Sequence, residues 1–247
     1  PKEYGWQGPC LLEQVICNEE YSNAHAPILP GYSGIALCGP TVMHWSPEEQ
    51  KARFLPHINR GELVIWQAFT EPEVGSDAAS IKTTAIRDGD DFIVNGTKVF
   101  IGGPTKPNYI WTTAVTNPDA PRHQNMGAFL IPAELEGISF APMELIVNSG
   151  KNFIYYDNVR VPGEYLVGGE GNGWRVAQTS LEIEHGGGGA LSSGEGRGAG
   201  GGIIGRLIEY SKETTRNGVV LSKDPHLRQL LVQQYIDNQI LRLLGLR

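Results

Sequence analysis

The sequence predicts an α+β protein in which a block of short strands lies between two helical blocks. Apolar residues recur at the spacing of an amphipathic helix near the start, at Leu11, Leu12, Val15 and Ile16. Short runs rich in β-branched and aromatic residues, separated by turn residues, fill the middle. Helical spacing returns after Gly171. We therefore expect an N-terminal helical domain over 1–62, a middle β domain over 63–168 and a C-terminal helical domain over 169–247.

The N-terminal block is expected to contain at least two helices. The first carries the apolar residues from Leu11 onward, and a Pro- and Gly-rich break follows at 27–34. Ser46, Pro47 and Glu49 then form the pattern of a capping box, in which the serine hydroxyl accepts a backbone hydrogen bond and the glutamate reaches back. This pattern predicts a second helix from about 47 to 58.

The middle block is predicted to be an antiparallel sandwich or small barrel. Its strand-like runs are LVIWQAF, FIVNG, KVFIGG, YIWTTAV, GAFLIP, ISFAPM, FIYYDNV and VRVP. They follow one another at short spacing without helices between them, which is typical of antiparallel sheets. Asp88-Gly89 and Asn95-Gly96 flank one run, and the Asn-Gly pair favours a tight hairpin.

The C-terminal block is expected to be an incomplete helical bundle. One helix is predicted from Trp174 to about Glu184, and the glycine-rich segment 185–202 should interrupt it. A last helix begins after Asp224, which is a good N-cap before Pro225. Its apolar stripe continues to the end of the sequence, so we expect the chain to be truncated at both ends.

Composition excludes several classes of protein. A net charge of −7 argues against binding to nucleic acid, which requires a clustered basic surface. There is no run of about 18 apolar residues, so no membrane span is expected. Three cysteines without a CxxC pair suit a reducing compartment, and the histidines lack the spacing of a metal site. We expect no metal and a cytoplasmic location in a bacterium, or the mitochondrial matrix if the source is eukaryotic.

One turn in the β block could bind an anion. A strand runs directly into Pro72, and Gly75-Ser76 then allows a tight turn with exposed amides. Such amides can hold a group such as a pyrophosphate. Taken alone, a Gly-Ser turn after a strand is more often only a turn.

The full string around this turn, QAFTEPEVGSD at 67–77, resembles the signature of the acyl-CoA dehydrogenases. Four more segments match that family in order: PKEYGWQG, SPEEQKARFLPHINRGE, VNGTKVFIGG and DNVRVPGEYLVGGEGNGW. The resemblance covers essentially the whole chain and implies the family's fold. It also implies FAD as the cofactor and the oxidation of an acyl-CoA thioester to the trans-2-enoyl-CoA. An electron-transfer flavoprotein is the implied electron acceptor, and a homo- or hetero-oligomer, dimer or tetramer, the implied assembly.

The resemblance also implies roles for individual residues. Phe69 and Thr70 match positions along the flavin ring, and Gly75 and Ser76 match positions at the pyrophosphate and the thioester end of the substrate. A further match is a triplet that covers the flavin, here Phe100, Ile101 and Gly102. The family usually has Thr or Ser at the third position, so Gly102 cannot supply the usual hydroxyl.

The catalytic base of the resembled reaction is a carboxylate that removes the α proton. Most members carry it further along the chain, but a minority place it at the position of Glu184. Glu182 lies two residues earlier, so only one of the two can face the flavin. His185 follows, where the family often has Arg; it is a candidate for contact with the substrate, and the alternative is a surface histidine at the end of the helix. The alternative is that Glu184 is a solvent-facing or ion-paired helix residue and that the true base is missing from this sequence.

Two other functions remain open. Acyl-CoA oxidases and flavin monooxygenases share the fold and let reduced flavin react with oxygen. The chain could also be a non-catalytic subunit of a heteromeric dehydrogenase. The observation behind this alternative is the missing hydroxyl at Gly102. The length and branching of the acyl group are not specified by the sequence.

Overall fold

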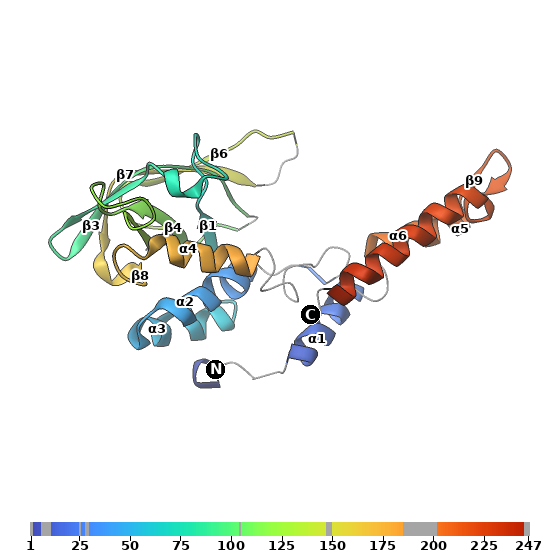
Figure 1. Ribbon diagram of the computed structural model, residues 1–247, viewed down its shortest axis with the longest axis horizontal. Helices are drawn as coiled ribbons and strands as arrows, with labels where there is room; N and C mark the ends of the chain where they lie inside the picture. The colour runs from blue at the N-terminus through green and yellow to red at the C-terminus, as the bar shows by residue number, and fades with distance from the viewer. Residues whose placement is uncertain are drawn as a thin grey trace. The chain divides into compact units, whose positions relative to one another are not determined.

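The computed structural model describes residues 2–5, 11–24, 26–27, 30–103, 105–146, 150–184 and 202–244. The chain forms two compact units (Figure 1). One consists of Pro1–Gln7 and Leu29–Glu184, and the other of Gly8–Ile28 and His185–Arg247. His185 and the glycine-rich segment after it lie outside the described residues.

The first unit contains an eight-stranded mixed sheet. Its strands are β1 (Ile65–Ala68), β2 (Thr84–Asp88), β3 (Asp91–Gly102), β4 (Tyr109–Val115), β5 (Met126–Pro132), β6 (Ile138–Pro142), β7 (Lys151–Pro162) and β8 (Leu166–Val167). They are arranged in the order β6-β7-β3-β2-β4-β5-β8, and β1 pairs with β4. Most pairs are antiparallel as expected, but β1–β4 and β2–β4 are parallel. The reason is that no hairpin joins these pairs, so the chain can return in the same direction.

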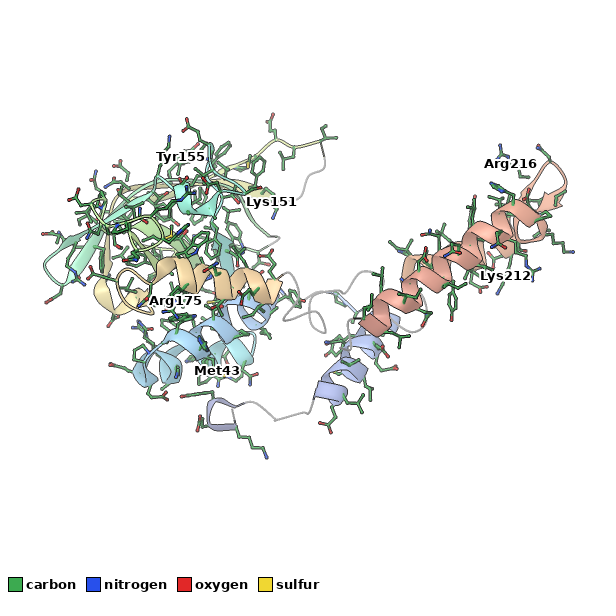
Figure 2. All side chains as sticks on the ribbon, viewed as in Figure 1. Met43, Lys151, Tyr155, Arg175, Lys212 and Arg216 are labelled. Carbon is green, nitrogen blue, oxygen red and sulfur yellow. The ribbon has the colours of Figure 1, made fainter. Side chains whose placement is uncertain are left out.

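Helices precede and follow these strands, which confirms the α+β class. The first unit has η1 (Lys2–Tyr4), η2 (Gly34–Cys38), α2 (Gly39–Trp45), α3 (Glu48–Asn59), η3 (Ala78–Ser80), η4 (Gly163–Tyr165) and α4 (Gly173–Glu182). In Figure 1, α4 lies between the sheet and helices α2 and α3. Trp45 Nε1 donates a hydrogen bond of 3.0 Å to Thr179 Oγ1, and the Arg175 guanidinium lies 5.2 Å from the Trp45 ring centre (Figure 2). These contacts hold α4 against α2.

The core contains buried residues of the sheet together with residues of α2, α3 and α4. Trp111, Phe92 and Phe129 are fully buried, and the two phenylalanine rings meet edge to face at 5.1 Å. Burying one such side chain stabilises the fold by roughly 1.5–3 kcal/mol. The core therefore provides a rigid support for the loops at the ends of β1 and β3.

Ser46 does not cap the second helix, so this prediction is wrong. The helix α3 begins at Glu48 with Pro47 as its N-cap, and no side-chain cap is formed. Ser46 instead ends α2, where its backbone N–H donates to the Val42 carbonyl at 2.9 Å. Its hydroxyl is buried without a hydrogen-bond partner among the described residues.

The predicted hairpin at Asn95-Gly96 is also wrong. Both residues lie inside β3, at an irregularity in its pairing with β7. The Asn95 side chain accepts a hydrogen bond of 2.8 Å from Asn158 N, and a Cβ on Gly96 would lie 2.5 Å from Thr83 Oγ1. Gly96 is therefore required by close packing rather than by a turn. The hairpin between β2 and β3 lies at the other turn pair, next to Asp88-Gly89.

The second unit is helical apart from a short hairpin. It contains α1 (Leu11–Asn23), α5 (Gly202–Glu213), β9 (Thr215–Arg216), β10 (Val219–Val220), η6 (Leu221–Lys223) and α6 (Pro225–Leu244). The Asp224 carboxylate accepts from His226 N at 2.9 Å and Leu227 N at 3.1 Å, which confirms the predicted cap. Among the described residues, no helix combines the length and apolarity that a membrane crossing requires.

Candidate active site

The segment after β1 contains a buried aromatic ring followed by a residue with two unpaired hydrogen-bond donors among the described residues. Phe69 is buried, with its ring centre 6.3 Å from that of Trp111. The Thr70 carbonyl accepts from Val99 N at 3.0 Å. Thr70 is half-buried, and neither its hydroxyl nor its N–H has a hydrogen-bond partner within the part of the chain that the structure describes. Thr70 therefore offers two donors to a bound group.

Glu71, the residue after Thr70, forms a buried ion pair with Lys98. Glu71 Oε1 and Lys98 Nζ are 2.8 Å apart, and their side chains are 4% and 0% exposed. Burial pushes the pKa of Glu71 upward, but the Lys98 charge and hydrogen bonds from Lys98, Thr83 and Lys82 bring it below its ordinary value. Burial holds the pKa of Lys98 below its ordinary value despite the attraction of Glu71.

The Gly75-Ser76 turn faces solvent. Glu71 and Val74 exchange backbone hydrogen bonds of 2.9 and 3.1 Å, which closes the chain just before the turn. A Cβ on Gly75 would meet no atom within 4 Å, so the backbone there is open to a ligand. The Asp77 carboxylate accepts from Ser80 Oγ at 2.5 Å and pairs with Arg122, which secures the far side of the turn.

Phe100 projects from β3 in a strained conformation. It has a φ of 60°, which is uncommon for a bulky residue, and it is 53% exposed. Its N–H donates to Met143 Sδ at 3.3 Å. A second pairing irregularity, between Lys98 and Ile101, produces this projection. Strained backbone positions of this kind cluster at functional sites.

Neither of the two residues after Phe100 offers a side chain to a ligand. Ile101 is buried in the core, so only its backbone could contact a ligand. Gly102 has a φ of 139°, and a Cβ there would lie 2.6 Å from the Gly150 carbonyl oxygen and 2.9 Å from Asn152 Nδ2. A serine or threonine does not fit this backbone. The absent hydroxyl is thus a consequence of the local backbone.

Glu184 is held beside β1. It is exposed, and its Oε2 accepts a hydrogen bond of 2.9 Å from Gln67 Nε2. The side-chain amide oxygen of Gln67 in turn accepts from Ser180 Oγ at 3.2 Å, and Ser180 Oγ accepts from Trp111 Nε1 at 3.4 Å. The chain Trp111–Ser180–Gln67 therefore orients the Glu184 carboxylate.

Two expected site residues thus lie near β1: Glu184 is bonded to Gln67, and Phe100 lies on β3, which contacts β1 without pairing with it. His185 lies outside the described residues.

Sequence reasoning missed Gln67, Glu71 and Lys98, although a lysine inside an apolar strand is an unusual signal. The donors of Thr70, the exposed ring of Phe100 and the open amides near Gly75 fit a flavin nucleotide. Among the described residues, no group of His, Cys, Asp and Glu side chains could hold a metal ion.

Comparison with known proteins gives consistent matches. The family model "Acyl-CoA dehydrogenase, N-terminal domain" matches residues 1–62, and "Acyl-CoA dehydrogenase, middle domain" matches 67–155. Acyl-CoA dehydrogenase FadE29 of Mycobacterium tuberculosis is 41% identical over 185 residues, which cover 74% of this chain and 47% of the relative.

Solved structures resemble the chain over nearly its whole length. The Tcur3481-Tcur3483 steroid ACAD aligns with a TM-score of 0.83 and 34% identity, covering 99% of this chain and 61% of that one. The ChsE4-ChsE5 complex from Mycobacterium tuberculosis aligns with a TM-score of 0.82 and 30% identity, covering 99% and 62%. The chain thus spans about half to three fifths of the length of these relatives.

Proposed function

Because this chain belongs to the acyl-CoA dehydrogenase family, we propose that it takes part in the oxidation of an acyl-CoA thioester to its trans-2-enoyl-CoA. Members of this family are FAD-dependent flavoproteins. A bound FAD supplies the acceptor for the hydride that leaves the β carbon. The chain's own residues must then remove the α proton and hold the reactants in place.

Glu184 is the proposed base that removes the α proton. The observation that carries this role is its hydrogen bond from Gln67, two residues before Phe69. Glu184 forms no salt bridge with any other described residue, so its carboxylate is not neutralised by a cation of the described chain. A base held in one orientation contributes to the rate by reducing the reorganisation needed before proton transfer.

The remaining site residues are proposed to bind and orient the cofactor and substrate. The N–H and hydroxyl of Thr70 would donate to the flavin ring, and Phe69 supports that segment from the core side. Phe100 would cover the ring with its exposed face, with Ile101 and Gly102 contributing backbone only. Gly75 and Ser76 would bind the pyrophosphate, and Ser76 with His185 the acyl-CoA.

The partners are proposed on the same grounds. We propose an electron-transfer flavoprotein as electron acceptor and an assembly of two or four subunits in the cytoplasm. The ChsE4-ChsE5 complex supports a hetero-oligomer as one such assembly. The similarity to a steroid ACAD makes a steroid-derived acyl-CoA the first substrate to test beside straight-chain ones.

The decisive experiment follows the visible spectrum of the protein in its full length, with added FAD. An acyl-CoA should bleach the bound flavin in the absence of oxygen. Glu184→Gln should abolish bleaching while FAD affinity stays unchanged. Glu182→Gln is the matched control, because Glu182 is also exposed at the end of α4.

Three results would contradict the proposal. Failure to bind FAD would remove the enzymatic function and favour a non-catalytic subunit. Undiminished bleaching in the Glu184→Gln variant would place the base elsewhere. Reoxidation that is faster with oxygen than with an electron-transfer flavoprotein would favour an oxidase or monooxygenase.

A further inference from the structure

A buried ion pair connects the two segments to which the proposed function assigns the flavin. Glu71 directly follows Thr70, and Lys98 precedes Phe100 by two positions. Glu71 Oε1 and Lys98 Nζ lie 2.8 Å apart with almost no solvent contact. Beside the pair, Val99 N donates to the Thr70 carbonyl at 3.0 Å. One charged and one neutral bond thus join the same two segments.

The pair is also bonded to the strands around it. The Glu71 carboxylate accepts from Lys82 N at 2.6 Å and from Thr83 N at 3.0 Å, which ties down the chain leading to β2. Lys98 Nζ makes a second bond of 2.9 Å to the Thr113 carbonyl in β4. The pair therefore fixes the loop after β1 against β3, β4 and the chain leading to β2.

Stability alone does not account for a pair of this kind. Removing two charges from water is costly, and apolar residues of similar size often hold a core equally well. What the pair adds is direction, because each hydrogen bond fixes a distance and an angle. This direction matters here because Glu71 adjoins Thr70 and Lys98 lies two positions before Phe100.

We propose that Glu71 and Lys98 are positioning residues, which hold the Thr70 segment and the Phe100 segment at a set separation before the cofactor binds. This inference rests on the proposed function, since it concerns the site for FAD. Preorganisation of this kind raises affinity by removing the cost of ordering the site on binding. Neither side chain needs to touch the cofactor.

The test compares FAD binding with folding in the protein in its full length. The double variant Glu71→Gln, Lys98→Met removes both charges together, so no unpaired charge is left buried. The matched control is Glu73→Gln, which breaks an exposed ion pair with Lys82 in the same loop. FAD affinity is measured by flavin fluorescence, the flavin environment by its visible spectrum and the stability of the cofactor-free protein by its unfolding midpoint.

The double variant should remain folded but bind FAD about tenfold or more weakly, with an altered flavin spectrum. The control should match the wild type in all three measurements. If the double variant bound FAD with wild-type affinity and showed an unchanged spectrum, the positioning role would be overturned. The proposed function would not be affected by that result. If the wild type itself bound no FAD, the proposed function would fail first and this inference with it.

Hydrogen exchange tests the same inference without any substitution. In the cofactor-free wild type, the amides of Lys82, Thr83 and Val99 should be as protected as those of the central strands. Rapid exchange without FAD and protection only with FAD would show that the cofactor orders the segment. That result would overturn the proposal even if the double variant did not fold.

Discussion

The side-chain amide of Gln67 in β1 donates a hydrogen bond of 2.9 Å to Glu184, which lies 117 positions later in the chain. The amide oxygen of Gln67 is occupied by Ser180 Oγ at 3.2 Å, so its NH₂ group is directed to the carboxylate. The hydroxyl of Ser180 also accepts from the fully buried Trp111. The orientation of an exposed carboxylate is thereby set from the core.

Replacing Gln67 by Met should slow catalysis without weakening FAD binding. Methionine has a similar length but no donor, so Glu184 would lose its orientation and the bleaching rate should fall about tenfold to a hundredfold. Anaerobic stopped-flow measurement of flavin reduction gives this rate. Ser180→Ala should cause a smaller loss, because it removes only the bond that orients Gln67. An unchanged rate in Gln67→Met would show that this orientation is not needed.

Restoring a hydroxyl at Gly102 should destabilise the protein. Gly102→Ser places a Cβ 2.6 Å from a carbonyl oxygen at a φ that side chains rarely adopt, and should lower the free energy of unfolding by about 2 kcal/mol or more. Chemical denaturation measures the loss. Gly61→Ala separates the effect of the positive φ from that of the steric clash. The φ of Gly61 is 69°, but a Cβ there would meet nothing within 4 Å, so a loss of about 1 kcal/mol in the free energy of unfolding is expected. Equal losses in both variants would exclude the clash.

Phe100→Asn should separate stability from cofactor binding. Asparagine tolerates a positive φ better than phenylalanine, so stability should stay the same or rise by at most about 1 kcal/mol. FAD affinity should nevertheless fall about three- to tenfold, because the exposed ring is lost. Tyr155→Asn is the control, since Tyr155 is another exposed aromatic residue of the sheet (Figure 2). Equal FAD affinity in all three proteins would remove Phe100 from the site.

The Glu71–Lys98 pair should make stability depend on pH in the acid range. Although burial raises the pKa of Glu71, Lys98 and the hydrogen bonds bring it below its ordinary value of 4.5. Between these values the unfolded chain binds more protons than the folded one, so the free energy of unfolding increases with pH. The contribution is present above pH 4.5 and is lost as the pH falls through the folded pKa.

Denaturation curves at several pH values check this dependence. The wild type should lose more stability below pH 4.5 than the Glu71→Gln, Lys98→Met variant. Other carboxyl groups with lowered pKa, among them Glu62 at about 2, are the same in both proteins and cancel in the difference. Parallel pH profiles would mean that folding does not lower the pKa of Glu71.

Local patterns of the sequence predicted the elements better than their connections. The alternating runs gave the strands, and Asp224 gave the start of α6, because both depend on neighbouring residues. The hairpin predicted at Asn95-Gly96 was wrong because an Asn-Gly pair suits an irregular position inside a strand as well as a turn. Ser46 misled because a serine between two helices can end one as well as begin the next.

The site was predictable only in part, for a related reason. Thr70 and Phe100 belong to motifs that can be recognised from the string itself. The partners Glu71 and Lys98 are 27 positions apart, and Gln67 and Glu184 are 117 apart, so the fold alone brings them together. The backbone at Gly102 depends on Gly150 and Asn152 in the same way.

The irregularity between Lys98 and Ile101 gives β3 a sensitivity to length. Residues two apart in a regular strand face the same side, yet Lys98 is buried and Phe100 is exposed. The number of residues in this stretch therefore decides which side chain leaves the core. In a regular strand Lys98 and Phe100 would face the same side, so either the ring would enter the core or the charge would leave it. Relatives that differ in length here should differ in function more than those that differ in residue type.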